Sequence, residues 1–221
     1  MNVPDNFRII TLLIALVLGG FSIATIYAET FTPKTPGFST GTPLADTVSY
    51  GRLGASAAAA ASLRGDLLAD IAMARAAPVL DSGNWSPKRE MLAAREPALA
   101  TARRSLSFAP HSSSTWLLAS MLHNQGDAEN LAVGALKMSY LTSSADVKLI
   151  PARLVVASRS PLNSDADLGN LARGDIRFIL TRRPDLKPAI TSAYSRGSPE
   201  GKAYIGDVAR SIDPDFAASL R

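Results

Sequence analysis

Serine, histidine and carboxylate side chains are the groups in this 221-residue chain that could carry chemistry. Residues 37–41, GFSTG, match the G-x-S-x-G pattern of a nucleophilic serine, here Ser39. The pattern works only between a strand and a helix, because a strained turn must hold the serine above a sheet. Pro36 and Pro43 flank the segment, and no strand-like alternation precedes it. We therefore interpret GFSTG as part of a linker.

The chain has two histidines and no cysteine, which leaves little for metal or thiolate chemistry. His111 precedes a run of three serines, a pattern typical of a helix N-cap. His123 falls near the end of an expected helix, where a cation complements the helix dipole. We predict no catalytic residue, no metal site and no cofactor.

A helical enzyme acting on a glycan stays open as an alternative, and it would need two carboxylates facing each other across a cleft. Most acids fall at positions expected on the surface or at helix caps. The available acids are Asp66, Asp70, Glu90, Glu96, Asp127, Glu129, Asp146, Asp165, Asp167 and Asp175.

Trp85 and His123 are the candidates for contact with a partner protein. Trp85 lies in an expected loop, whereas Trp116 has leucines at helical spacing and is expected in the core. The net charge is +4, and Arg103–Arg104 and Arg182–Arg183 are the adjacent arginine pairs. Basic residues do not alternate with aromatic ones, so we expect no nucleic-acid partner.

Residues 9–28 are a run of twenty uncharged, mostly apolar residues. This run indicates where in the cell the rest of the chain is located. A helix of this length spans about 30 Å, the thickness of a bilayer's hydrocarbon core. We predict a transmembrane signal anchor over residues 1–28, in contact with membrane lipid through residues 9–28. The alternative is a cleaved signal peptide, with Ile26, Tyr27 and Ala28 as an imperfect cleavage site.

Gly20, Ala24 and Ala28 recur at four-residue spacing on one face of this helix. Small residues at that spacing allow two helices to approach closely in lipid. We predict that these three residues form a helix association face, through which the chain forms a homo-oligomer.

Beyond the apolar run, the pattern predicts a Pro/Thr-rich linker over residues 29–43, acting as a spacer, and an all-α domain over residues 44–221. No strand is expected. The expected helices lie around residues 63–78, 87–107, 114–124, 128–141, 146–158, 164–182, 184–197, 199–212 and 216–220. Pro78 and residues 82–84 are expected to close the first of them. Residues 164–167 form a capping box at the start of the helix over 164–182, and Ser198 is the expected N-cap of the helix over 199–212.

The centre of this domain, over about residues 98–142, resembles a tetratricopeptide (TPR) repeat. The residues that carry the resemblance are Ala98, Ala102, Ser105, Pro110, Trp116, Leu118, Ala119, Gln125, Gly126 and Asp127. The resemblance implies a stack of helical hairpins that binds proteins through a concave face. A generic helical hairpin would produce similar spacing, so both interpretations stay open.

Seventeen arginines against six lysines, with heavy use of alanine, are typical of proteins from GC-rich bacteria. We therefore expect a single-pass protein of the bacterial inner membrane with its domain in the periplasm. The function that this combination favours is a scaffold or accessory subunit that binds other envelope proteins. A soluble periplasmic binding module, released by cleavage, is the second alternative.

Overall fold

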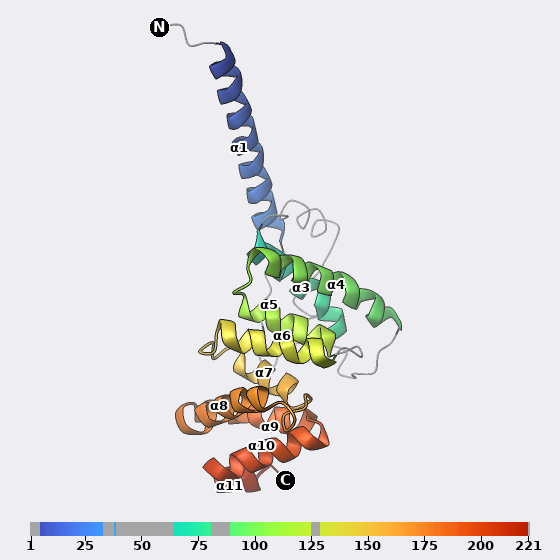
Figure 1. Cartoon of the computed structure of the whole chain (residues 1–221), viewed down its shortest axis with the longest axis vertical. Coiled ribbons are helices and arrows are strands. Elements are labelled where there is room, and N and C mark those ends of the chain that lie inside the picture. Colours follow the sequence, from blue (N-terminus) through green and yellow to red (C-terminus); the bar gives the residue numbers. More distant parts are fainter. Residues whose placement is uncertain (1–4, 33–37, 39–63, 81–88, 125–128, 221) are drawn as a thin grey trace.

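The computed structural model describes residues 5–32, 38, 64–80, 89–124 and 129–220, and every regular element within them is a helix. The all-α prediction is therefore confirmed for the described part of the chain. Trp85 and the serine of GFSTG lie outside the described residues. Figure 1 shows one long helix, α1, projecting from a stack of shorter helices.

Helix α1, Asp5–Phe31, contains the predicted apolar run. The most apolar 18-residue stretch of this helix has a mean hydropathy of 2.5, and none of its residues is buried inside the protein. It is the one described helix that is long and apolar enough to cross a membrane. The helix ends three residues after the expected boundary at Ala28, because Glu29, Thr30 and Phe31 continue it before the first linker proline.

The remaining helices follow the sequence pattern closely. Their bounds are α3 Gly65–Leu80, α4 Arg89–Phe108, α5 Ser113–His123, α6 Glu129–Thr142, α7 Ile150–Ala157, α8 Ala166–Arg182, the 3-10 turn η2 Pro184–Leu186, α9 Lys187–Arg196, α10 Pro199–Ile212 and α11 Pro214–Ala218. Pro78 was expected to close its helix, but α3 continues for two residues beyond it.

Side-chain caps fix the helix starts in the last third of the chain. The Ser198 hydroxyl accepts a hydrogen bond from the Gly201 amide, which confirms the predicted cap of α10. The start predicted for α8 is wrong by one residue, because Asp165 rather than Ser164 caps that helix. The Asp165 carboxylate accepts from the Leu168 amide at 3.0 Å, while the Ser164 hydroxyl donates to the Pro161 carbonyl.

Helices α3 and α4, and then α5 and α6, pack as antiparallel pairs. The start of α3 lies against the end of α4, where the Ser105 hydroxyl donates to the Gly65 carbonyl at 2.6 Å. In the next pair, α5 and α6, Ser113 contacts Ser139 at one end and Ser120 contacts Ala132 at the other. Small residues permit this close approach: Ala98, Ala102 and Ser105 are all fully buried.

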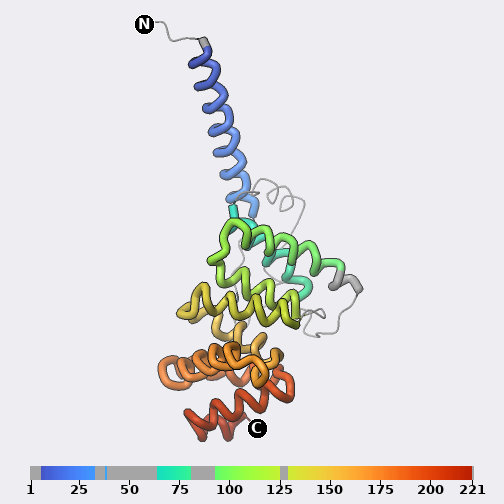
Figure 2. Tube along the Cα trace, viewed as in Figure 1, coloured from blue at the N-terminus to red at the C-terminus, as the bar shows by residue number. Residues whose placement is uncertain are grey.

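Figure 2 shows the helices stacked in layers. Clusters of buried apolar side chains connect each layer to the next. One cluster joins α3, α4, α5 and α6, a second joins α5 to α8, and a third joins α7 to α11. Phe38, from the segment after α1, packs against the first and second clusters. The described part of the domain therefore has a continuous core rather than separate units.

The start of α10 passes so close to the end of α7 that only glycine fits at position 201. A Cβ atom there would overlap the Ser158 backbone carbonyl, which accepts hydrogen bonds from the Ser198 amide and hydroxyl. We expect Gly201→Ala to lower the free energy of unfolding by about 1–3 kcal/mol, because the backbone must shift to relieve the overlap.

Gly206→Ala, in the same helix, is the matched control. A Cβ atom at position 206 would lie 3.8 Å from the Tyr194 ring, an ordinary van der Waals distance. This variant is expected to raise the free energy of unfolding by about 0.5–1 kcal/mol, as alanine for glycine inside a helix does. Denaturation followed by tryptophan fluorescence measures both, and equal effects would contradict the assignment of Gly201.

Candidate functional site

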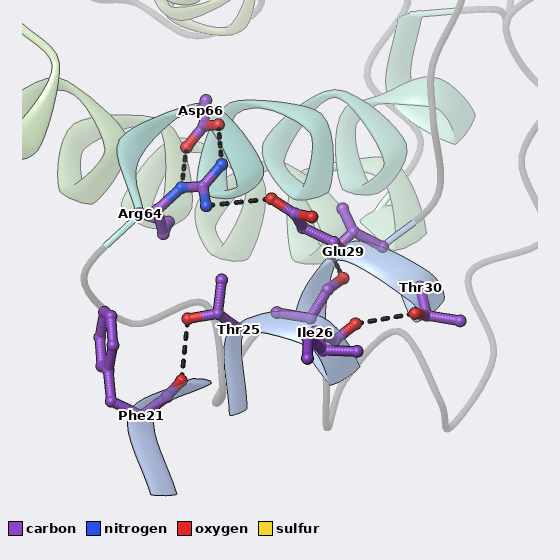
Figure 3. A network of polar contacts seen from close by, with 9 residues as sticks. Phe21, Thr25, Ile26, Glu29, Thr30, Arg64 and Asp66 are labelled. Carbon is purple, nitrogen blue, oxygen red and sulfur yellow. Dashed lines mark hydrogen bonds and ion pairs between the residues drawn. The ribbon is translucent and has the colours of Figure 1, made fainter. Parts of the chain in front are cut away.

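The end of α1 is joined to the start of the domain by an arginine. Figure 3 shows Arg64, which precedes α3, between Glu29 of α1 and Asp66 of α3. Its guanidinium lies 3.1 Å from the Glu29 carboxylate and makes two hydrogen bonds to Asp66, at 2.9 and 2.6 Å. The bonds from Arg64 hold the pKa of Asp66 below its usual range. The chain thus returns to α1 after 35 residues.

The ion pair determines how the start of α3 lies relative to the end of α1. Residues 29–43 were expected to act as a spacer between the bilayer and the domain, and most of them, 33–37 and 39–43, lie outside the described residues. The Glu29–Arg64 contact places the start of α3 directly beside the end of α1. An exposed pair of this kind contributes only about 0–1 kcal/mol, but Ala28 and Thr32 are also buried at this junction.

The polar side chains of α1 are satisfied within the helix. Thr11, Ser22 and Thr25 each donate a hydrogen bond to the carbonyl four residues earlier, at 2.8–2.9 Å. These internal bonds are what a helix needs in lipid, where no water replaces a missing partner. Tyr27 and Phe31 lie with ring centroids 4.7 Å apart near the domain end of the helix.

The predicted association face is only partly available. A Cβ atom at Gly20 would meet no atom of the chain within 4 Å, and Ala24 is half-buried. Ala28 is fully buried within the chain. A second α1 helix could therefore approach through Gly20 and Ala24, whereas the chain itself covers Ala28.

His123 and Trp116 occupy core-facing positions. His123 is the last residue of α5, as expected, but only 8% of it is exposed. Burial lowers its pKa, with Arg103 and Arg95 acting in the same direction. The Trp116 indole packs against the first core cluster and donates to the Pro110 carbonyl at 2.8 Å. His123 is thus poorly placed to contact a partner.

The outer face of α6 carries an apolar stripe that no described residue covers. Leu131 is 56% exposed and Leu141 is 73% exposed. Gly134 and Met138 lie between them on the same face, and a Cβ atom at Gly134 would meet no atom within 4 Å. We call Leu131, Gly134, Met138 and Leu141 the α6 stripe. The spacing of these residues is similar to that of the apolar side chains through which one amphipathic helix binds another.

A buried polar cluster lies where α5, α6, α7 and α8 meet. Arg153 of α7 is fully buried, and its guanidinium donates to the Ser113 hydroxyl, the Ser139 hydroxyl and carbonyl, and the Ser143 carbonyl, at 2.5–3.1 Å. It also lies 4.7 Å from the centre of the Tyr140 ring. One arginine therefore ties three helices together.

Asp175 of α8 completes this cluster. It is 6% exposed, and burial raises its pKa to about 7 against the opposing effects of Tyr140 and Arg153. Burial, reinforced by Asp175, also raises the pKa of Tyr140. Within the described part of the chain, Asp175 Oδ2, the Tyr140 hydroxyl and Arg153 Nη1 have no hydrogen-bond partner.

Sequence reasoning missed Arg153, although a signal was present. Arg153 falls three residues after Ile150 and one before Leu154, on the core-facing side of α7. A charged side chain at a core-facing position predicts that buried polar groups lie nearby and form hydrogen bonds with it.

Several acids that an enzyme would require already have structural partners. Asp165 caps α8 and accepts from the Lys137 ammonium at 2.7 Å, while Asp66 is bound by Arg64. An open depression along α9 is lined by Lys187, Pro188, Thr191, Ser192, Ser195 and Arg196, none of which is acidic. This part of the chain therefore supplies no carboxylate pair across a groove.

Comparisons with known protein families, with curated proteins and with solved structures found no match to this chain.

Proposed function

We propose that this protein is a single-pass, membrane-anchored helical scaffold or accessory subunit that binds other proteins of a bacterial envelope assembly. Two surfaces support the proposal. Helix α1 exposes large apolar side chains along most of its length, and the domain exposes the α6 stripe. A long apolar helix that the rest of the protein leaves exposed belongs in lipid, and an apolar stripe on a polar domain is typical of a binding face.

The α6 stripe is the observation that carries the protein-binding part of this proposal. Burying one leucine side chain contributes about 1.5–3 kcal/mol, so Leu131 and Leu141 together could supply much of a specific contact. The stripe is helical, narrow and flanked by Asn130 and Lys137, which suits an apolar helix face of another protein. The TPR-like interpretation would extend the same logic to neighbouring helical pairs.

Location is part of the proposal. The arginine-rich, alanine-rich composition favours a bacterial host, and Arg8 directly before the apolar run favours a cytoplasmic location for that end of α1. The domain then lies in the periplasm, next to the inner membrane. The absence of cysteine is compatible with that compartment, because the domain has a continuous apolar core and needs no disulfide.

Co-purification tests the proposal. A tagged chain is solubilised from its native membranes in mild detergent, and the proteins that accompany it are compared with those of the Leu131→Glu, Leu141→Glu double variant. We expect specific partners with the wild type and their loss in the double variant. Thr191→Glu, at an exposed site on α9, is the matched control and should keep them.

Recovery of free monomer from the wild type, under conditions that preserve other envelope complexes, would overturn the scaffold proposal. Retention of the same partners by the double variant would show that they bind through another face.

A further inference from the structure

Two adjacent arginines and a phenylalanine lie exposed at the corner of the domain nearest α1. Arg103, Arg104, Ser107 and Phe108 share the outer face of the last turns of α4, and Phe108 is 45% exposed. We call these four residues the α4 corner. The corner is tied to the junction through Ser105, whose hydroxyl donates to the Gly65 carbonyl, next to Arg64.

The end of α1 fixes where a bilayer surface would lie. The uncharged run ends at Ala28, so Tyr27 and Phe31 fall at headgroup level and Glu29 just outside the hydrocarbon. Glu29 contacts Arg64 directly, which leaves no room for a spacer between this surface and the start of α3. In Figure 1 the end of α4 that carries Phe108 lies beside the end of α1, and α11 lies at the far end of the stack.

The chemistry of the corner matches a membrane interface. Aromatic rings are favoured at headgroup level, and arginine side chains bind lipid phosphates. Glu29 and Asp66 already share Arg64, and the exposed basic side chains of this corner are Arg103 and Arg104 of α4. Arg103 and Arg104 would each strengthen binding to an anionic surface about fivefold, since one basic residue near such a surface contributes about 1 kcal/mol.

We infer that the α4 corner binds the anionic headgroup layer of the bilayer that α1 spans, so that the domain lies against the membrane instead of hanging from a spacer. This inference rests on the anchor in the proposed function, but not on any protein partner. Phe108 enters the interface, and Arg103 and Arg104 contact lipid phosphates. The α6 stripe is not needed for this contact.

A spin label on the full chain in vesicles tests the inference. The chain has no cysteine, so Ser107→Cys places one label at the corner beside an intact Phe108, and Ser219→Cys places a matched label beyond α11. The vesicles contain phosphatidylcholine and phosphatidylglycerol. Power-saturation measurements compare the access of each label to oxygen, which concentrates in lipid, and to a water-soluble nickel complex.

We expect the label at position 107 to be accessible to oxygen and protected from nickel, and the label at position 219 to show the reverse. Adding Phe108→Ser, or Arg103→Gln with Arg104→Gln, should return the label at 107 toward the values at 219. Equal nickel access at 107 and 219 in the otherwise unchanged chain would overturn the inference. Neither outcome affects the co-purification test, because that test measures the binding of partner proteins through the α6 stripe.

Discussion

Replacing Arg153 by alanine is expected to lower the free energy of unfolding by about 3–5 kcal/mol. The substitution removes a fully buried side chain of large volume and leaves a cavity among α5, α6 and α7. It also removes the charged donor to the Ser139 and Ser143 carbonyls, which keep only weaker neutral donors, and a hydrogen bond to a charged group contributes about 1.5–3 kcal/mol. Denaturation of the full chain in mild detergent, followed by tryptophan fluorescence, measures the loss.

Two further variants distinguish the loss of the buried Arg153 contacts from a general effect of removing an arginine. Arg177→Ala removes an exposed arginine from α8 and should change the free energy of unfolding by less than about 0.5 kcal/mol. Arg153→Met keeps much of the volume but none of the donors, so it should lie between the other two variants. If Arg153→Ala lowered the free energy of unfolding no more than Arg177→Ala does, the buried cluster would not contribute to stability.

The second large effect is a dependence of stability on pH that comes from Asp175. Burial raises the pKa of this carboxyl from the model-peptide value of 3.8 to about 7 in the folded chain. Between these values the folded state binds more protons than the unfolded state, so the free energy of unfolding falls as the pH rises. A shift of this size corresponds to roughly 4 kcal/mol, lost between about pH 4 and pH 7.

Asp175→Asn removes this titration, so the difference between wild type and variant isolates it. Other groups cancel in the difference, including His123, whose lowered pKa makes stability rise with pH near neutrality. We expect the free energy of unfolding of the wild type to increase relative to that of the variant as the pH falls from 7 to 4. A constant difference across that range would show that Asp175 titrates normally.

Much of the fold could be predicted because the local signals were strong. The Ser198–Pro199 start of α10 and the apolar run of α1 each depend on a few neighbouring residues, so they can be recognised without the tertiary structure. The one-residue error at α8 arose because Ser164 and Asp165 are both good caps. Spacing alone could not decide between them.

The functional surfaces depended on contacts far apart in the sequence. Glu29 and Arg64 are separated by 35 residues, so nothing local indicated that Arg64 contacts the end of α1. The α6 stripe was hidden for a similar reason, because only the packing of α6 against its neighbours shows which of its apolar residues stay exposed. The Arg153 cluster needed four helices to be placed before its partners were apparent.

Retention of α1 in the mature protein is the claim on which the anchor, the junction and the membrane contact all depend. The most direct measurement is mass spectrometry of tryptic peptides from carbonate-washed membranes of the native host. Trypsin cuts after Arg8 and Lys34, so an uncleaved chain yields the peptide of residues 9–34. We predict that peptide in the membrane fraction. A chain found in the soluble fraction, with a peptide beginning at Glu29, would contradict the account and favour the soluble binding module.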